Sequence, residues 1–342
     1  MPAPAHILVI RFSAMGDVAM TVPVLKNLLQ QNQHLQITVV SNAFFKPLFA
    51  GLERCHFHSA YLNKEHKGVA GIYLLYKELK ALQPFTAIAD LHGVLRSFNL
   101  RLFFGFSGIP IAAIDKGRKE KKLLTRKVDK HLVQLTTSFE RYAVVFRNLG
   151  YTCELKNEQP IFSRQPLPAA AQDFFAGKEK VIGIAPFAQH FQKMYPILRT
   201  KNVVKALSDE GYSILLLGGG QQEMEVLQQW QDEIKGNVFN IAGKFSFAEE
   251  LAIISNLTQM LSMDSANMHL ASLYGVPVIS IWGATHPFAG FYGWGQPVEN
   301  MVNVDIYCRP CSVFGNKPCY RGDFACIMRI EENAILDKVN KL

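Results

Sequence analysis

Short apolar runs alternate with longer, helix-like patterns along this 342-residue chain. In the first half, the apolar runs predict buried strands at residues 6–12, 35–41 and 85–91. Apolar residues at helical spacing predict helices near residues 17–31, 73–82, 95–104 and 132–149. Apolar strands that alternate with helices are typical of a parallel sheet with both faces covered. We therefore expect the first half to be a doubly wound α/β domain.

The second half repeats this alternation. Apolar runs predict strands at residues 181–185, 213–217, 238–241, 259–263 and 276–282. Ser246 and Glu249 have the spacing of a capping box, so a helix is expected to begin after Ser246. Residues 157–168 hold three prolines and show no periodicity, which is typical of a linker. We predict two α/β domains, residues 1–160 and 161–327, followed by a C-terminal segment, residues 328–342.

The charge balance of the chain favours an anionic partner. Lys and Arg number 36 against 28 Asp and Glu, a formal net charge of +8. Phosphate, nucleic acid and lipid headgroups all suit such an excess. The longest weakly polar stretch, residues 102–114, is shorter than the ~18–20 residues that span a bilayer. The N-terminus lacks the pattern of a secretion signal, so we expect a soluble, cytoplasmic protein.

The turn after the first predicted strand carries an acidic residue. Gly16 permits a tight turn, and Asp17 opens a helix whose dipole stabilises a carboxylate by about 0.3–1 kcal/mol. Asp17 is therefore either a helix-start residue or a general base that takes a proton from a hydroxyl nucleophile. The turn holds one glycine and not a GxGxxG pattern, so a dinucleotide site is not expected here.

A second acidic turn follows the strand at residues 259–263. Ser265 and Asn267 open a helix and are able to direct polar groups at an anion, while Asp264 is able to accept from a sugar hydroxyl. His269 follows Ser265 by four residues, so the two share a helix face. The other interpretation is that Asp264 or Ser265 caps the helix and His269 is an interior histidine.

Two further loops follow strands of the second half. Lys193 lies after the strand at residues 181–185, where it is either a solvated surface lysine or a cation that neutralises a leaving diphosphate. Gly218, Gly219 and Gly220 follow the strand at residues 213–217. They allow close approach of a ligand whose ribose binds Glu223, or they form a tight turn before a helix.

Four cysteines cluster near the C-terminus, at positions 308, 311, 319 and 326. Structural zinc, free thiols and disulfides remain open, whereas a catalytic metal is not expected because no cluster of histidines or carboxylates accompanies Cys308, Cys311, Cys319 and Cys326. Residues 116–130 are rich in Lys and Arg and form either a solvated face or a surface for an anionic acceptor or membrane. The run lacks the interleaved aromatic residues of a nucleic-acid surface.

Several motifs occur together in a recognisable order: RFSAMGDVAMTVP at residues 11–23, DLHGVLRS at 90–97, the Lys193 loop, MDSANMHLA at 263–271 and WGATHP at 282–287. Together they resemble the lipopolysaccharide heptosyltransferases of glycosyltransferase family 9, and the resemblance covers nearly the whole chain. It implies a GT-B architecture, in which two Rossmann-like, doubly wound domains face a cleft. The acceptor is then expected in the first domain and the nucleotide sugar mainly in the second.

The resemblance also implies an activity. It is the inverting transfer of a heptose from an ADP-sugar to an anionic lipopolysaccharide (lipid A–core) acceptor, with no metal, cofactor or nucleic acid, on the cytoplasmic face of the inner membrane. Asp17 is then the base, Lys193 faces the diphosphate, and residues 328–342 hold a helix that returns toward the first domain. Acceptor-side residues are Ser13, Gly16 and Arg96. Donor-site residues are Gly219, Glu223, Met263, Asp264, Ser265, Ala266 and His269.

The sequence departs from the family pattern at the donor site. Ala266 stands where glycine is common, and Ala188 and Gln189 replace hydroxyl residues before the lysine. Two other functions remain as alternatives: a sugar-nucleotide epimerase or hydrolase on the same fold, and a non-catalytic anion-binding protein. An epimerase or hydrolase would consume the donor without acceptor, and an anion-binding protein would bind its ligand in a salt-sensitive manner without Asp17 or Asp264.

Overall fold

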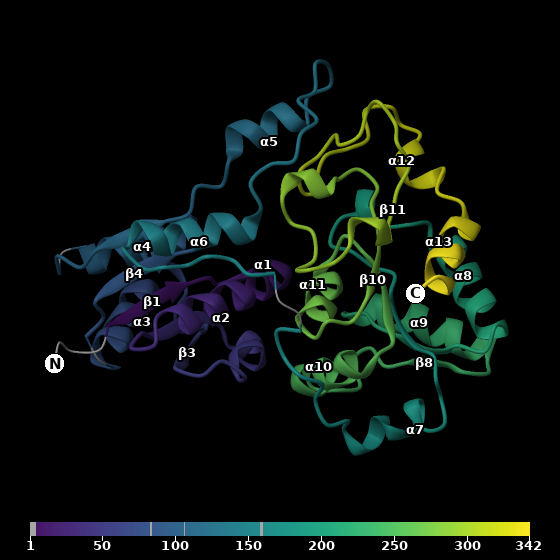
Figure 1. The fold of residues 1–342 in the computed structure, drawn as a ribbon, viewed down its shortest axis with the longest axis horizontal. Helices are drawn as coiled ribbons and strands as arrows, with labels where there is room; N and C mark the ends of the chain where they lie inside the picture. Colours follow the sequence, from purple (N-terminus) through teal and green to yellow (C-terminus); the bar gives the residue numbers. More distant parts are fainter. Residues whose placement is uncertain (1–4, 83, 106, 158–159) are drawn as a thin grey trace. The chain divides into compact units, whose positions relative to one another are not determined.

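The computed structural model of the chain describes residues 5–82, 84–105, 107–157 and 160–342. They form two compact units, each with its own parallel sheet (Figure 1). The first unit comprises residues 1–118 and 136–157, and the second comprises residues 119–135 and 158–342. The expected fold of two doubly wound α/β domains is therefore confirmed.

The sheet of the first unit has the strand order β3-β2-β1-β4-β5, with all neighbours parallel. Its strands are β1 (His6–Ile10), β2 (Gln36–Asn42), β3 (Cys55–Ala60), β4 (Ala87–Asp90) and β5 (Ile111–Ala113). The sequence predicted β1, β2 and β4. It missed β3 and β5, because β3 is an edge strand that carries two histidines and a serine, and β5 has only three residues.

Helices cover both faces of this sheet. They are α1 (Met15–Ala19), α2 (Thr21–Gln31), α3 (Gly68–Leu82), α4 (Leu95–Gly105) and α6 (Ser138–Asn148), with a 3-10 segment, η1 (Ala43–Phe49). Leu8 and Ile10 of β1 pack in one core with apolar residues of α3 and α4. Successive strand residues point to opposite faces, so Ile7 and Val9 of β1 point to the other face of the sheet. Helices α2 and α6 pack against each other.

Three predicted helices of the first unit have different bounds from those expected. The helix predicted near residues 73–82 begins at Gly68, as α3. The single helix predicted near residues 17–31 is two helices, α1 and α2, which meet at Met20. The helix predicted over residues 132–149 begins only at Ser138, because the hydroxyl of Thr137 accepts from the Glu140 amide and caps it there.

The second sheet has the order β11-β10-β9-β6-β7-β8, again with all neighbours parallel. Its strands are β6 (Val181–Ala185), β7 (Ser213–Leu216), β8 (Val238–Asn240), β9 (Gln259–Met263), β10 (Val278–Ile281) and β11 (Met301–Val302). Five of these lie where the apolar runs predicted them. The two-residue β11 was missed, because so short a strand leaves no pattern in the sequence.

The helices of the second unit are α7 (Gln172–Phe175), α8 (Ile197–Asp209), α9 (Gln221–Ile234), α10 (Phe247–Asn256), α11 (Ala266–Leu273), α12 (Ala325–Met328) and α13 (Glu332–Asn340). The predicted capping box is present at the start of α10, where Ser246 and Glu249 bond reciprocally. Short 3-10 segments complete the unit: η2 (Ala169–Ala171), η3 (Phe191–Lys193), η4 (Pro287–Ala289) and η5 (Val298–Asn300).

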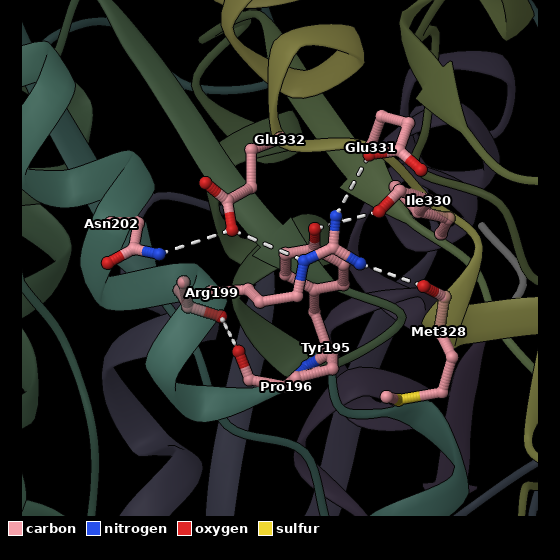
Figure 2. Close-up of polar contacts among 9 residues, drawn as sticks. Tyr195, Pro196, Arg199, Asn202, Met328, Ile330, Glu331 and Glu332 are labelled. Atoms are coloured by element: carbon pink, nitrogen blue, oxygen red, sulfur yellow. Dashed lines mark hydrogen bonds and ion pairs between the residues drawn. The ribbon is translucent and has the colours of Figure 1, made fainter.

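The C-terminal helix α13 packs within the second unit. Ile335 and Val339 are fully buried in its core, and the side-chain amide of Gln259 donates to the Val339 carbonyl at 3.0 Å. Figure 2 shows the contacts that hold the segment before α13: Arg199 of α8 donates to the Met328 carbonyl at 2.8 Å and pairs with Glu332 at 3.2 Å. Residues 328–342 thus pack on α8 within the second unit, and their expected return toward the first domain stays a prediction.

Residues 119–135 also differ from the predicted division. They lie inside the predicted domain 1–160 but pack with the second unit. This segment includes most of α5 (Arg118–Leu124). Lys130 Nζ donates to the Pro310 carbonyl at 2.6 Å, the Leu135 amide donates to the Phe288 carbonyl at 2.9 Å, and Lys127 lies 5.0 Å from the centre of the Tyr320 ring.

Candidate active site

Asp17 lies at the carboxyl end of β1, in the first turn of α1. Its Oδ2 is 2.6 Å from Nη2 of Arg11, the residue that follows β1. Arg11 is buried and is held in place by donating to the Leu91 carbonyl at 2.7 Å. The Asp17 side chain is nevertheless 42% exposed, so solvent and a ligand have access to this carboxylate. Ser13 is exposed and Gly16 half-buried in the same turn.

The neighbouring strand β4 contributes His92 to the same edge of the sheet. Asp90 accepts from the backbone amides of His92 and Gly93, both at 2.9 Å, and so fixes the turn after β4. The Phe12 amide points at His92 Nδ1 at 3.4 Å, a contact that needs this nitrogen unprotonated. Burial, and after it the positive charges of Arg11 and Lys116, lowers the pKa of His92 to about 3.

Positive charge surrounds Asp17 at this edge. Burial lowers the pKa of the Lys116 ammonium, and the nearby Arg11 and Arg118 act in the same direction. Arg96 is exposed at the start of α4, close enough for its charge to act on His92. The edge therefore combines one accessible carboxylate with several cations, an arrangement that suits an anionic ligand bearing a hydroxyl group. The sequence interpretation did not single out Arg11 or His92.

The second unit brings Lys193 and Asp264 together. Asp264 follows β9 and is buried, and Lys193 closes the segment η3 after β6. Lys193 Nζ lies 2.9 Å from Asp264 Oδ2, and the Thr285 hydroxyl donates to the same oxygen at 2.7 Å. The Lys193 side chain is largely buried, so the alternative of a solvated surface lysine is wrong.

Backbone packing fixes the position of Lys193. The carbonyl of the preceding Gln192 accepts from the Ala284 amide at 3.2 Å, which ties η3 to the turn after β10. Gly315 packs directly on the lysine stem: a Cβ built at Gly315 would lie 2.5 Å from Cγ of Lys193. Tyr195 is buried beneath the loop and donates its hydroxyl to the Ile330 carbonyl at 2.8 Å (Figure 2).

The turn before α11 holds the other predicted donor residues. Ser265 occupies the N-cap position of α11, but its side chain makes no capping hydrogen bond; its Oγ is 3.0 Å from Ser262 Oγ. His269 is buried within α11. Met263 is fully buried, and its sulfur accepts from the Tyr195 amide at 3.3 Å. Met263 therefore supports the Lys193 loop through its contact with the Tyr195 amide.

Gly219 and Glu223 form a closed turn at the end of β7. The Gly219 amide donates to Glu223 Oε2 at 2.7 Å. This contact fits the tight-turn interpretation, and it uses one carboxylate oxygen of Glu223. Because the strand order is β10-β9-β6-β7, Thr285, Asp264, Lys193 and Glu223 follow neighbouring strands along one edge of the sheet.

Arg309 is a buried cation that sequence reasoning missed. Its Nε donates to the carbonyls of Gly283 and Thr285, each at 3.0 Å, and its Nη1 donates to Asn303 Oδ1 at 2.6 Å. Burial lowers the pKa of Arg309 to about 10, so the guanidinium remains charged at neutral pH. Arg309 thereby holds the turn from which Thr285 reaches Asp264.

The C-terminal cysteines are free thiols. All six cysteines belong to the described residues, and none is paired in a disulfide. Burial raises the pKa of Cys326 to about 11 and also raises the pKa of Cys311. Within the part of the chain that the structure describes, no three His, Cys, Asp or Glu side chains are arranged to hold a metal ion. Of the possibilities left open for these cysteines, structural zinc is not supported. Over the same residues, no helix has the length and apolar character needed to cross a membrane.

Comparison with known proteins identifies the family. The profile of glycosyltransferase family 9 (heptosyltransferase) matches residues 72–318. Lipopolysaccharide heptosyltransferase 1 of Pseudomonas aeruginosa is 21% identical over 325 residues, which cover 90% of this chain and 86% of that protein. Lipooligosaccharide heptosyltransferase 2 of Haemophilus influenzae is 29% identical over 120 residues, so the match spans only 34% of this chain and 35% of that relative.

The fold agrees with this result. The structure of the E. coli heptosyltransferase WaaC with ADP superposes with a TM-score of 0.67 at 19% identity, over 98% of this chain and 99% of that one. The parallel-sheet units are those of a GT-B glycosyltransferase, as the motifs implied. The chain therefore belongs to glycosyltransferase family 9, the heptosyltransferase family.

Proposed function

We propose that this protein transfers a heptose from an ADP-sugar to an anionic lipopolysaccharide inner-core acceptor, with inversion at the anomeric carbon and without a metal ion. One observation carries the proposal beyond family membership. Asp17, Lys193 and Asp264, three charged residues of the family motifs, each lie in the segment that follows the carboxyl end of a parallel strand. Ligands of doubly wound folds bind at these edges.

On the donor side, the ADP-sugar binds along the edge of β9, β6 and β7. Its diphosphate lies near Lys193 and the start of α11, where a cation and backbone amides stabilise negative charge. Asp264 is held by Lys193 and the Thr285 hydroxyl, so its Oδ2 is occupied and its Oδ1 accepts from the sugar. The bound ADP of the WaaC structure supports an adenine nucleotide as the leaving group.

Glu223, Met263, Ala266 and His269 complete the donor side in different ways. Glu223 uses Oε2 to close its own turn and offers Oε1 to the ribose. Met263 contributes indirectly, because its sulfur accepts from the Tyr195 amide next to the Lys193 loop. His269 contributes from a buried position within α11. Ala266 is the first residue of α11, and its backbone amide is one of those that the helix leaves for an anion.

On the acceptor side, Asp17 takes the proton of the acceptor hydroxyl as the oxygen attacks the anomeric carbon. The bond from that carbon to the diphosphate breaks on the opposite face, ADP leaves, and the proton stays on Asp17 until it passes to water. Arg11 fixes the direction of the carboxylate. Ser13 and Gly16 of this turn contact the acceptor, together with Lys116 and with Arg96 at the start of α4.

The acceptor is thus assigned to the first domain and the donor to the second. Such an acceptor is carried on lipid. We therefore place the protein in the cytoplasm, with peripheral contact to the cytoplasmic face of the inner membrane, and assign it no nucleic-acid partner.

The test is transfer by the purified full chain, with ADP-heptose and a deacylated inner-core acceptor. The proposal predicts equal amounts of ADP and heptosylated acceptor, formed in the presence of a chelator, with the anomeric configuration of the donor inverted in the product. It also predicts little loss of ADP-heptose when the acceptor is omitted. Rapid turnover of the donor alone would instead indicate a hydrolase or epimerase and would overturn the proposal.

A further inference from the structure

Helix α4 exposes an apolar stripe to solvent. Leu95, Phe98 and Leu102 are 75%, 50% and 49% exposed. Their spacing of three and then four residues places them on one face of the helix. The opposite face packs into the core of the first unit through Ser97, Leu100 and Phe104, which are all buried. Helix α4 is thus apolar on both faces, although one of them faces water.

Helix α3 extends this apolar surface. It packs beside α4, and the ring of Tyr73 meets the ring of Phe103 edge-on at 5.2 Å. Val69 and Tyr73 are themselves exposed and lie one helical turn apart. We name the surface formed by Val69, Tyr73, Leu95, Phe98 and Leu102 the α3–α4 face. Single exposed apolar residues are ordinary, whereas several exposed apolar residues on two helices that pack together are typical of an interaction surface.

The charges around the α3–α4 face are of one sign. Lys77 and Lys80 are exposed on α3, and Lys77 lies over the Tyr73 ring at 5.1 Å. Arg96 is exposed beside Leu95. The sequences of α3 and α4 hold a single acidic residue, Glu78, whose two carboxylate oxygens bind His58 and His66 at 3.1 and 3.2 Å. An apolar surface with a cationic border complements an anionic lipid interface.

The position of this face connects it to the acceptor edge. Leu95 begins α4 shortly after β4 ends at Asp90. The connecting turn begins at Leu91, whose carbonyl accepts from Arg11 at 2.7 Å, and Arg11 pairs with Asp17 at 2.6 Å. The apolar stripe therefore starts beside the proposed acceptor site and runs away from it along α4. A surface that holds the protein on a membrane at this place would bring a lipid-borne hydroxyl close to Asp17.

We infer that the α3–α4 face docks on an anionic lipid bilayer, with Leu95, Phe98 and Leu102 inserted among the headgroups and Lys77 and Lys80 against their phosphates. The inference rests on the proposed function in one respect, because an acceptor carried on lipid must be met at a membrane. A second copy of the chain is the less suitable occupant. A two-fold contact through this face would place Lys77, Lys80 and Arg96 of both copies together, and like charges oppose such a contact.

The experiment is flotation of the full chain with two kinds of vesicle: phosphatidylcholine alone, and phosphatidylcholine mixed with phosphatidylglycerol in equal parts. We expect strong binding to the mixed vesicles and weak binding to phosphatidylcholine. The triple variant L95S/F98S/L102S should bind the mixed vesicles at least tenfold more weakly, and K77Q/K80Q should lose most of the preference for phosphatidylglycerol. The matched control is L198S, because Leu198 on α8 is 76% exposed and lies in the other unit.

A second measurement separates docking from folding and from catalysis. The triple variant should keep wild-type transfer to the deacylated, water-soluble acceptor, because none of its three positions belongs to the proposed active site. In F98W, the added tryptophan should shift its emission to the blue on mixed vesicles. Wild-type vesicle binding by the triple variant would overturn the inference. The inference would also be overturned if the wild-type protein were a dimer that does not bind vesicles and the triple variant were a monomer. If wild type binds vesicles but transfers no heptose, the proposed function fails and the docking surface stands.

Discussion

Lys193 Nζ lies 2.9 Å from Asp264 Oδ2, and both side chains are largely buried. The two residues come from the loops after β6 and β9, neighbouring strands of the second sheet. The pair thus brings a cation to the edge where the diphosphate is proposed to bind, and it ties the loop of η3 to the sheet. The proposed function therefore predicts that catalysis, as well as local stability, depends on this pair.

Replacement of Lys193 should therefore affect both. Lys193→Ala leaves the Asp264 carboxylate buried without its cation, which typically costs about 3–5 kcal/mol. We expect a lower melting temperature, a raised KM for the ADP-sugar and slower transfer. The control is Lys201→Ala, because Lys201 pairs with the more exposed Glu233, and such pairs contribute about 0–1 kcal/mol. Equal kinetics and equal stability in both variants would remove Lys193 from the donor site.

Gly315 should control the position of the same lysine. A methyl group at Gly315 would overlap the Lys193 stem at 2.5 Å from Cγ. Gly315→Ala should therefore displace Lys193 and raise the KM for the donor. Gly322→Ala is the matched control: its φ of +79° is close to the +75° of Gly315, so backbone strain is similar, but the space around it is open. If the two variants have the same KM, backbone strain and not Lys193 explains the effect.

His92 should make the stability of the first unit sensitive to acid. Its pKa is about 3 in the folded protein, below the ordinary value of 6.5, so the unfolded chain binds a proton more readily. The stability that neutral His92 contributes is full above pH 6.5 and is lost as the pH falls toward 3. His92→Gln should flatten the decline in melting temperature between pH 6.5 and 4. A decline as steep as that of wild type would show that other groups cause it.

Much of the second unit could be predicted from its sequence. Its strands β6 to β10 are largely buried and apolar, so each gives a clear apolar run in the sequence. Asp264 was placed correctly at the end of one of them. The pairing of Lys193 with Asp264 had no such signal, because it depends on which strands are neighbours. The role of Arg309 could not be predicted for the same reason, because its partners are backbone carbonyls of a turn that is distant in the sequence.

The first unit was harder to predict at its margins. The edge strand β3 carries His56 and His58 in place of an apolar run, so it did not look like a strand. Residues 119–135 look like a solvated basic segment in sequence. Their attachment to the second unit depends on a few contacts, such as Lys130 with the Pro310 carbonyl, that no local pattern encodes. Asp17 could be predicted, whereas its partner Arg11 was read only as part of a motif.

The most direct test of the account is to measure transfer and donor affinity together in Asp17→Asn. Asp17 belongs to the first unit and the proposed donor site to the second. Loss of the general base should therefore lower kcat by about 10²–10⁴-fold, while the Kd for the ADP-sugar stays unchanged. Full transfer activity in Asp17→Asn would contradict the central claim that this carboxylate activates the acceptor hydroxyl.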